Sequence, residues 1–167
     1  MEIEYKKIEE KTNRNVKFDH EKGEIRLFGT RIALTNLLPA CEKVDKMFGT
    51  GGEVIINCMA FEQGRQLFEA MMTNSPNKSK EELLKEVADV QPQAGLGIAS
   101  LEILSDNPPK IEVVVKNSPV KTLRGSAKQW IGAFWAGVLS KYFSQQLKCT
   151  SFSYDEEEDK LRCVITA

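Results

Sequence analysis

The sequence predicts an α+β domain in which antiparallel hairpins of a sheet pack against a helical layer. Two observations favour this class: the chain contains several helical segments, and its strand-like segments mostly pair through short turns instead of forming repeated βαβ units. With 167 residues, 41% of them hydrophobic, the chain can bury a sizeable core as one domain. We expect this single domain over residues 16–167, after a charged, loosely held segment at residues 1–15.

Composition and charge favour neither a nucleic-acid partner nor a membrane. The formal net charge is -1, and the basic residues are scattered without interleaved aromatic residues, so nothing attracts a phosphate backbone. The segment Met1–Arg14 lacks the apolar stretch of a signal peptide, and no stretch has the length of a membrane span. We therefore expect a cytoplasmic protein. In that compartment its four cysteines are more often free or metal-bound than paired in disulfides.

The first forty-eight residues contain a hairpin signal and a helix signal. Two strand-like runs, Val16–Phe18 and Glu24–Phe28, flank a polar turn that ends in glycine. A helix is predicted to begin at a cap formed by Thr35 or Asn36 and to run to Phe48, because its apolar residues follow helical spacing. The glycine after Phe48 suits the end of such a helix.

The next segment is expected to form a strand and two helices. The short apolar run Glu53–Cys58 has the length of a strand, and the pattern of Ala60–Met72 is helical. Ser79 followed three residues later by Glu82 is a capping box, which marks the start of another helix. The apolar residues of that helix share one face: Leu83, Leu84, Val87 and Val90.

Two further hairpins are predicted in the second half of the chain. Strands Leu96–Leu104 and Ile111–Lys116 are joined by the turn residues Ser105–Pro109, and alternate residues of the second strand are apolar. Strands Lys148–Tyr154 and Lys160–Thr166 flank an acidic run that we interpret as a solvated hairpin tip.

Between these hairpins, the predicted helix Ala127–Phe143 has the strongest functional signal. Ser126 and Gln129 form a capping box at its start. The helix holds both tryptophans and is apolar almost all round, except for one strip of small or polar residues: Lys128, Gly132, Ala136 and Ser140. Such a helix can be ordinary core, the aromatic wall of a pocket, or a seam where a second helix approaches along the strip. Periodicity favours ordinary core, but the sequence leaves all three open.

The C-terminal third resembles a known family. A strand ending in Asn117-Ser118-Pro119 leads to a helix containing Ala133–Ser140, and a hairpin with a cysteine on each strand follows. Weaker agreement comes from Gly23–Leu27 and Arg31–Leu34. In these features the chain resembles the 4-vinyl-reductase domain family, described as predicted hydrocarbon-binding proteins. That family is related in fold to TRAPP-type trafficking subunits and to the sensor domains of phenol-responsive transcription activators.

The resemblance implies a TRAPP-like α+β fold, often dimeric, that holds a small hydrophobic molecule in an internal pocket. Our leading hypothesis is therefore a non-catalytic domain that binds a hydrophobic or aromatic ligand, with no cofactor. The expected ligand contacts are Trp130, Phe134 and Trp135, helped by Phe61, Phe68 and Met71 from a facing helix. The expected homodimer interface is Gly132, Ala136 and Ser140.

The alternative hypothesis is a dimeric scaffold or protein-interaction module in which the same helix is fully packed core. An enzyme ranks third. We identify no catalytic residue, because the single histidine, His20, lies in a predicted turn and cannot easily complete a catalytic triad.

The family's metal site is incomplete in this sequence. Metal-binding members have a cysteine before the helix, then Glu-x-x-Cys, then a last cysteine across the hairpin. Cys149 and Cys163 match the last two, but Gln146 replaces the glutamate, and no cysteine lies between Asn117 and Cys149. A structural zinc site needs four nitrogen, sulfur or carboxylate ligands. We therefore expect no bound metal.

The predicted register of the last hairpin bears on these cysteines. If Tyr154 faces Lys160, Cys149 and Cys163 are diagonal neighbours whose Cα atoms lie about 7–8 Å apart. A disulfide seldom spans more than about 7 Å between Cα atoms. We expect two free thiols, although a shift of one residue in the register would change that distance.

Overall fold

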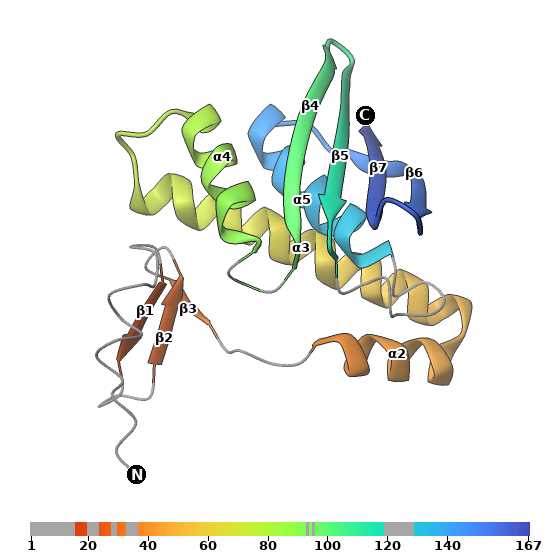
Figure 1. Ribbon diagram of the computed structural model, residues 1–167. Coiled ribbons are helices and arrows are strands. Elements are labelled where there is room, and N and C mark those ends of the chain that lie inside the picture. The colour runs from red at the N-terminus through yellow and green to blue at the C-terminus, as the bar shows by residue number, and fades with distance from the viewer. Residues whose placement is uncertain are drawn as a thin grey trace.

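The computed structural model describes residues 16–19, 24–27, 30–32, 37–92, 94, 96–118 and 129–167. The predicted loose segment, residues 1–15, and His20 lie outside this part of the chain, so the predicted domain boundaries stay a prediction. Figure 1 shows the elements in chain order. They are β1 (Val16–Asp19), β2 (Glu24–Leu27), β3 (Thr30–Ile32), α2 (Leu37–Phe48), α3 (Thr50–Asn74), α4 (Lys80–Val90), β4 (Ile98–Asp106), β5 (Pro109–Lys116), α5 (Trp130–Phe143), β6 (Lys148–Asp155) and β7 (Lys160–Thr166).

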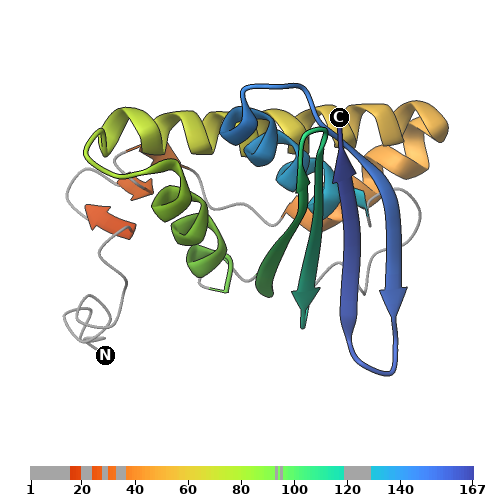
Figure 2. The ribbon, with the colours of Figure 1, turned by 90° about the horizontal axis from the view of Figure 1, so that it is seen from above.

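The strands form two antiparallel sheets, and the fold class is α+β as predicted. One sheet has the order β1-β2-β3, and it includes the predicted first hairpin and a third strand that was not predicted. The other has the order β4-β5-β7-β6, with every neighbouring pair antiparallel. Helix α5 lies between this four-stranded sheet and the long helix α3 (Figures 1 and 2). The site is built around α5 because α5 contacts both layers.

The predicted strand Glu53–Cys58 was wrong, because these residues lie inside α3. The buried residues of α3 follow one another at intervals of three or four: Gly52, Ile56, Ala60, Gly64, Phe68 and Met71. This spacing is one face of a helix. Val54 and Ile55 are exposed, so the β-branched run does not form a buried strand. Packing of the stripe against α2 and α5 outweighs the local preference of valine and isoleucine for strands.

The other elements follow the predictions with shifts at their ends. The capping box at Ser79 is present, since its Oγ accepts from the Glu82 N–H and the Glu82 carboxylate accepts from the Ser79 N–H. Strands β4 and β5 extend further into the predicted turn than expected. Helix α5 begins at Trp130, and Gln129 makes no side-chain cap there, whereas Ser126 lies outside the described residues.

The core is continuous through the three layers. Phe68 from α3, Trp135 and Ile131 from α5, and Ile111 and Val113 from β5 have exposed fractions of 0%. The apolar face that alternation predicted for β5 therefore packs on α5, and the buried face of α4 is the predicted one.

Helices α3 and α5 cross at two glycines. A Cβ atom at Gly64 would lie 2.0 Å from the carbonyl oxygen of Phe134, and one at Gly137 would lie 1.9 Å from the carbonyl oxygen of Phe61. Real Cβ atoms do not approach backbone oxygen so closely. The two backbones therefore touch directly, and glycine is required at both positions of the crossing.

Candidate functional site

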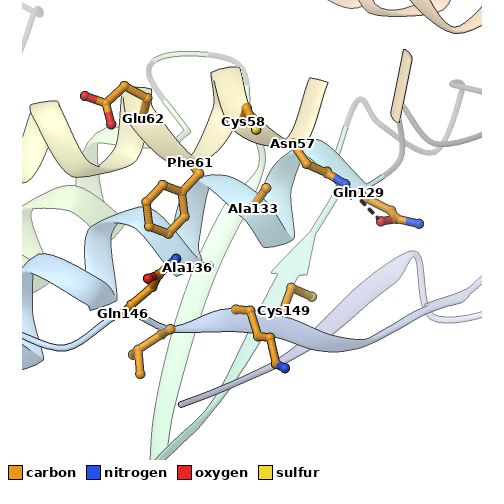
Figure 3. A pocket seen from close by; sticks show the side chains of 11 residues that line it. Asn57, Cys58, Phe61, Glu62, Gln129, Ala133, Ala136, Gln146 and Cys149 are labelled. Atoms are coloured by element: carbon orange, nitrogen blue, oxygen red, sulfur yellow. Dashed lines mark hydrogen bonds between the residues drawn. The ribbon is translucent and has the colours of Figure 1, made fainter. Parts of the chain in front are cut away.

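A hollow of about 560 Å³ opens beside this crossing, and we call it the α3–α5 hollow. Figure 3 shows its wall. The lining residues come from three segments: Asn57, Cys58, Phe61 and Glu62 from α3; Gln129, Ala133 and Ala136 from the start of α5; and Gln146, Leu147, Lys148 and Cys149 from the entry to β6.

Helical spacing explains which side chains face the hollow. Asn57 and Phe61 are four residues apart on α3, and Gln129 and Ala133 are four apart at the start of α5, so each pair shares a helix face. The alanines leave space that larger side chains would fill. The Phe61 ring is half-buried and extends from α3 toward Ala136 and Gln146 (Figure 3).

The polar part of the wall includes a hydrogen-bonded pair of amides. Asn57 Nδ2 donates a hydrogen bond to Gln129 Oε1 at 3.4 Å (Figure 3). Asn57 Oδ1 is buried and has no hydrogen-bond partner among the described residues. An unpaired buried acceptor is uncommon in proteins, and a donor supplied by a ligand or a water would satisfy it. Asn57, a residue of the wall, therefore carries a buried acceptor whose hydrogen bond is not made within the described part of the chain.

Glu62 is the carboxylate of the wall, and its partners hold it in the charged form. Its two oxygens accept from Arg65 at 2.6 and 2.8 Å, and Gln66 Nε2 donates to it at 2.8 Å. These hydrogen bonds, first of all those from Arg65, lower the pKa of Glu62 to about 2. At neutral pH this carboxylate is an ionised partner of Arg65, which makes it a poor general acid or base.

A second hollow of about 580 Å³ adjoins the first and shares Phe61, Glu62 and Gln146 with it. Its other lining residues are mostly polar: Arg65, Met72, Lys80, Ser140, Lys141, Ser144 and Gln145. Lys80 Nζ donates to the carbonyl oxygen of Tyr142 at 2.8 Å, and Lys141 pairs with Glu69 at 2.9 Å. These cations already have partners, so this second hollow resembles a solvated surface more than an apolar pocket.

The structure brings one of the six predicted ligand residues to the α3–α5 hollow. That residue is Phe61. The other five, Trp130, Phe134, Trp135, Phe68 and Met71, are buried in the core, none with more than 5% of its surface exposed. Trp130 stacks on Phe134 with ring centroids 5.4 Å apart, and Phe134 meets Trp135 edge to face. The aromatic cluster therefore belongs to the core and does not line the hollow.

Sequence reasoning missed the amides and alanines of the wall. Gln129 and Ala133 are four residues apart in a helix that was predicted, so their shared face could have been identified from the sequence. The prediction of ligand contacts relied on the tryptophans of that helix instead. Asn57 and Cys58 could not be placed, because the run that contains them was predicted as a strand.

The small-residue strip of α5 faces the hairpin of the same chain. Gly132 lies against the Cys149 and Cys163 sulfurs, and Ala136 lines the α3–α5 hollow. Ser140 Oγ donates to the Ala136 carbonyl oxygen at 2.6 Å and accepts from the Leu147 N–H at 2.9 Å. All three positions are buried. Their predicted role in a dimer interface stays a prediction.

Among the described residues, no group of three or more histidine, cysteine, aspartate or glutamate side chains could hold a metal ion. Within the same part of the chain, no helix is both long and apolar enough to cross a bilayer.

No family model matches the sequence, and no curated protein matches it. Solved structures do match. The phenol-responsive sensory domain of the transcription activator PoxR, crystallised with phenol, has a TM-score of 0.66 at 14% identity, over 99% of this chain and 91% of that chain. A trafficking protein particle complex subunit 3 from Naegleria fowleri, covalently bound to palmitic acid, has a TM-score of 0.51 at 12% identity, over 77% and 88%.

A vinyl-4-reductase family protein from Methanocaldococcus jannaschii matches at a TM-score of 0.42 and 15% identity, over 80% of this chain and 96% of that chain. At these identities the first two likenesses show the fold alone. They confirm the predicted relationship of this fold to phenol-sensor domains and TRAPP-type subunits.

Proposed function

We propose that this protein binds a small hydrophobic or aromatic molecule in the α3–α5 hollow and does not transform it. The observation that supports this proposal most is the hollow itself, because about 560 Å³ suits a small ligand. Ligand sites typically combine an apolar wall with a few fixed polar groups. Phe61, Ala133 and Leu147 supply the apolar wall, and the Asn57–Gln129 amide pair supplies polar groups.

The structural neighbours support the same class of ligand. One neighbour was crystallised with phenol, and the other is covalently bound to palmitic acid. Both molecules combine an apolar body with a polar end. In this chain a ligand hydroxyl that reached the Asn57 amide would supply the missing donor for Oδ1, while the apolar body would lie against Phe61.

A binding role suits this lining better than catalysis. Glu62, the carboxylate in the wall, is ionised and held by Arg65. Lys148 and two cysteines are the other ionisable groups of the wall, and none of the lining residues is a histidine that could exchange protons near neutral pH. We therefore propose no catalytic residue and no cofactor.

Filling the hollow is expected to weaken binding. Ala133→Leu adds three carbon atoms to the wall, so we expect it to weaken a ligand's affinity by about tenfold or more, a loss of about 1.4 kcal/mol. Isothermal titration calorimetry with phenol, toluene and decanoic acid as probes measures this. Ala40→Leu is the matched control, because Ala40 is exposed on α2 and does not line the hollow. The proposal fails if no probe binds the wild-type chain, or if Ala133→Leu binds as well as Ala40→Leu.

We also propose that the protein is a homodimer. Large apolar side chains are exposed along α2 and the first half of α3: Met47, Phe48, Val54, Ile55 and Met59, with exposed fractions between 39% and 62%. Exposed apolar side chains of this size on neighbouring helices are typical of a protein–protein contact. A second copy would cover them with the same residues, as the two-fold symmetry of most homodimers requires.

A charge on this surface is expected to separate the dimer. Val54→Glu places a carboxylate in the apolar contact, so light scattering after gel filtration should give the mass of two chains for the wild type and one for the variant. Gln63→Glu, at an exposed position of the same helix, should remain dimeric. A wild-type protein that is monomeric at every concentration contradicts the dimer, and two dimeric variants contradict this surface.

A further inference from the structure

Two cysteine side chains meet at the wall of the α3–α5 hollow. Cys149 lines the hollow, whereas Cys163 is fully buried. Both sulfurs point at Gly132 of α5: a Cβ atom on that glycine would lie 2.7 Å from Cys149 Sγ and 3.3 Å from Cys163 Sγ. The two thiols share a hydrogen bond. Gly132 leaves the space in which they meet, because any larger residue would enter it.

A bulge in β6 lies next to this pair. Tyr154 pairs with Leu161, not with the predicted Lys160, so Cys163 faces Phe152. The register shifts back between Cys149 and Ser151, so Cys149 faces Ile165, which is the partner that a regular ladder from a Tyr154–Lys160 pair would give it. A bulge increases the local twist of a strand and redirects its side chains. The predicted distance between the Cα atoms of the two cysteines assumed a regular ladder of hydrogen bonds. Because the bulge makes the ladder irregular at this point, that distance no longer applies.

The environment of the pair makes the two thiols different. The hydrogen bond from Cys163 lowers the pKa of Cys149, although burial opposes this. The same hydrogen bond and the burial of Cys163 raise the pKa of Cys163. The thiolate is the nucleophilic form of cysteine. The sulfur that a small molecule in the hollow can reach is that of Cys149, because Cys149 lines the hollow and Cys163 has no exposed surface.

We propose that Cys149 and Cys163 are a peroxide modification site that closes to a disulfide in the wall of the hollow. In the first step the Cys149 thiolate attacks hydrogen peroxide, which breaks the O–O bond, leaves Cys149 as a sulfenic acid and releases hydroxide. In the second step the Cys163 sulfur attacks the Cys149 sulfur. The S–S bond forms, the S–O bond breaks, and the Cys163 proton leaves with the hydroxyl group as water. The two thiols are oxidised by two electrons and the peroxide is reduced.

The other two cysteines do not share this arrangement. Cys58 is exposed on α3 and also lines the hollow, and Cys41 is buried on α2, where burial raises its pKa. All four thiols are free in this structure, so the pair is described in its reduced form. The proposed oxidation depends on the two sulfurs and not on any bound ligand, so it can be tested apart from the proposed binding function.

The test is peptide mapping of the folded full chain after treatment with hydrogen peroxide. Trypsin cleaves after lysine and arginine, so it releases Cys149 on the peptide 149–160 and Cys163 on the peptide 163–167. We expect these two peptides to be joined by a disulfide in the wild type and in Cys58→Ser, and the link to disappear on reduction. In Cys163→Ser we expect Cys149 to stop at the sulfenic acid, which dimedone traps.

Three outcomes would overturn the proposal. One is oxidation of wild-type Cys149 to the sulfinic acid with no link to Cys163. Another is a disulfide that includes Cys58 in place of Cys163. The third is a folded wild-type protein in which both thiols of the pair stay reduced while exposed Cys58 is oxidised. The wild-type map decides each of these, so the proposal remains testable even if a serine variant fails to fold.

Discussion

Replacing Gly137 by alanine is expected to destabilise the protein by about 3 kcal/mol or more, which is the upper end of the cost of overpacking a core. The added Cβ would lie 1.9 Å from the carbonyl oxygen of Phe61, and a backbone atom cannot rotate away as a flexible side chain can. The two helices must therefore separate along their crossing. Urea denaturation followed by circular dichroism gives the loss as a lower midpoint.

Gly51→Ala is the matched control for this substitution. Gly51 lies near the start of α3, is exposed, and would place its Cβ in ordinary contact with Phe48 Cβ at 3.9 Å. Alanine is favoured over glycine in helices by about 1 kcal/mol, so we expect this variant to equal or exceed the wild type in stability. If Gly137→Ala is as stable as Gly51→Ala, the helices do not cross as closely as described.

Removing the indole of Trp135 is expected to cost about 3–5 kcal/mol, because truncation of a buried large aromatic residue to alanine leaves a cavity that the core fills only in part. Trp135 has no exposed surface, and it packs edge to face on Phe134. The free energy of unfolding from urea titrations measures the change. A cost below that of an ordinary surface substitution would mean that Trp135 is not in a packed core.

Trp135→Phe separates the loss of volume from the loss of the indole N–H. The Trp135 Nε1 is buried and has no hydrogen-bond partner among the described residues, so removing it relieves an unpaired polar group. We expect this variant to lose no more than about 1.5 kcal/mol, much less than Trp135→Ala. Equal losses for the two variants would indicate that the N–H has a partner.

Local patterns predicted the elements whose stabilising contacts are close in sequence. The capping box at Ser79, the alternation of Ile111 and Val113, and the turn between β6 and β7 each involve residues a few positions apart, and each was confirmed. Such features are specified by the geometry of one helix turn or one strand, which a single sequence displays directly.

The sequence did not predict features that depend on contacts between distant segments. Helix α3 is continuous through Val54 and Ile55 because of the surfaces it packs against, and strand propensity does not report those surfaces. The bulge near Ser151 is also set by how β6 meets β7 and α5. As a result, the amide of Asn57 and the meeting of the two thiols both went unpredicted, although the aromatic helix beside them was identified.

The glycine crossing has a consequence for how such a chain can diverge. Gly64 and Gly137 allow the two helix backbones to touch, and neither glycine lines the hollow. The volume is set next to them by Ala133 and Phe61. Substitutions that change side-chain size at Ala133 or Phe61 can therefore alter the volume of the hollow while the glycines keep the helix crossing. The shape of the hollow and the stability of the fold can then change independently in evolution, although the residues that set them lie close together on the same two helices.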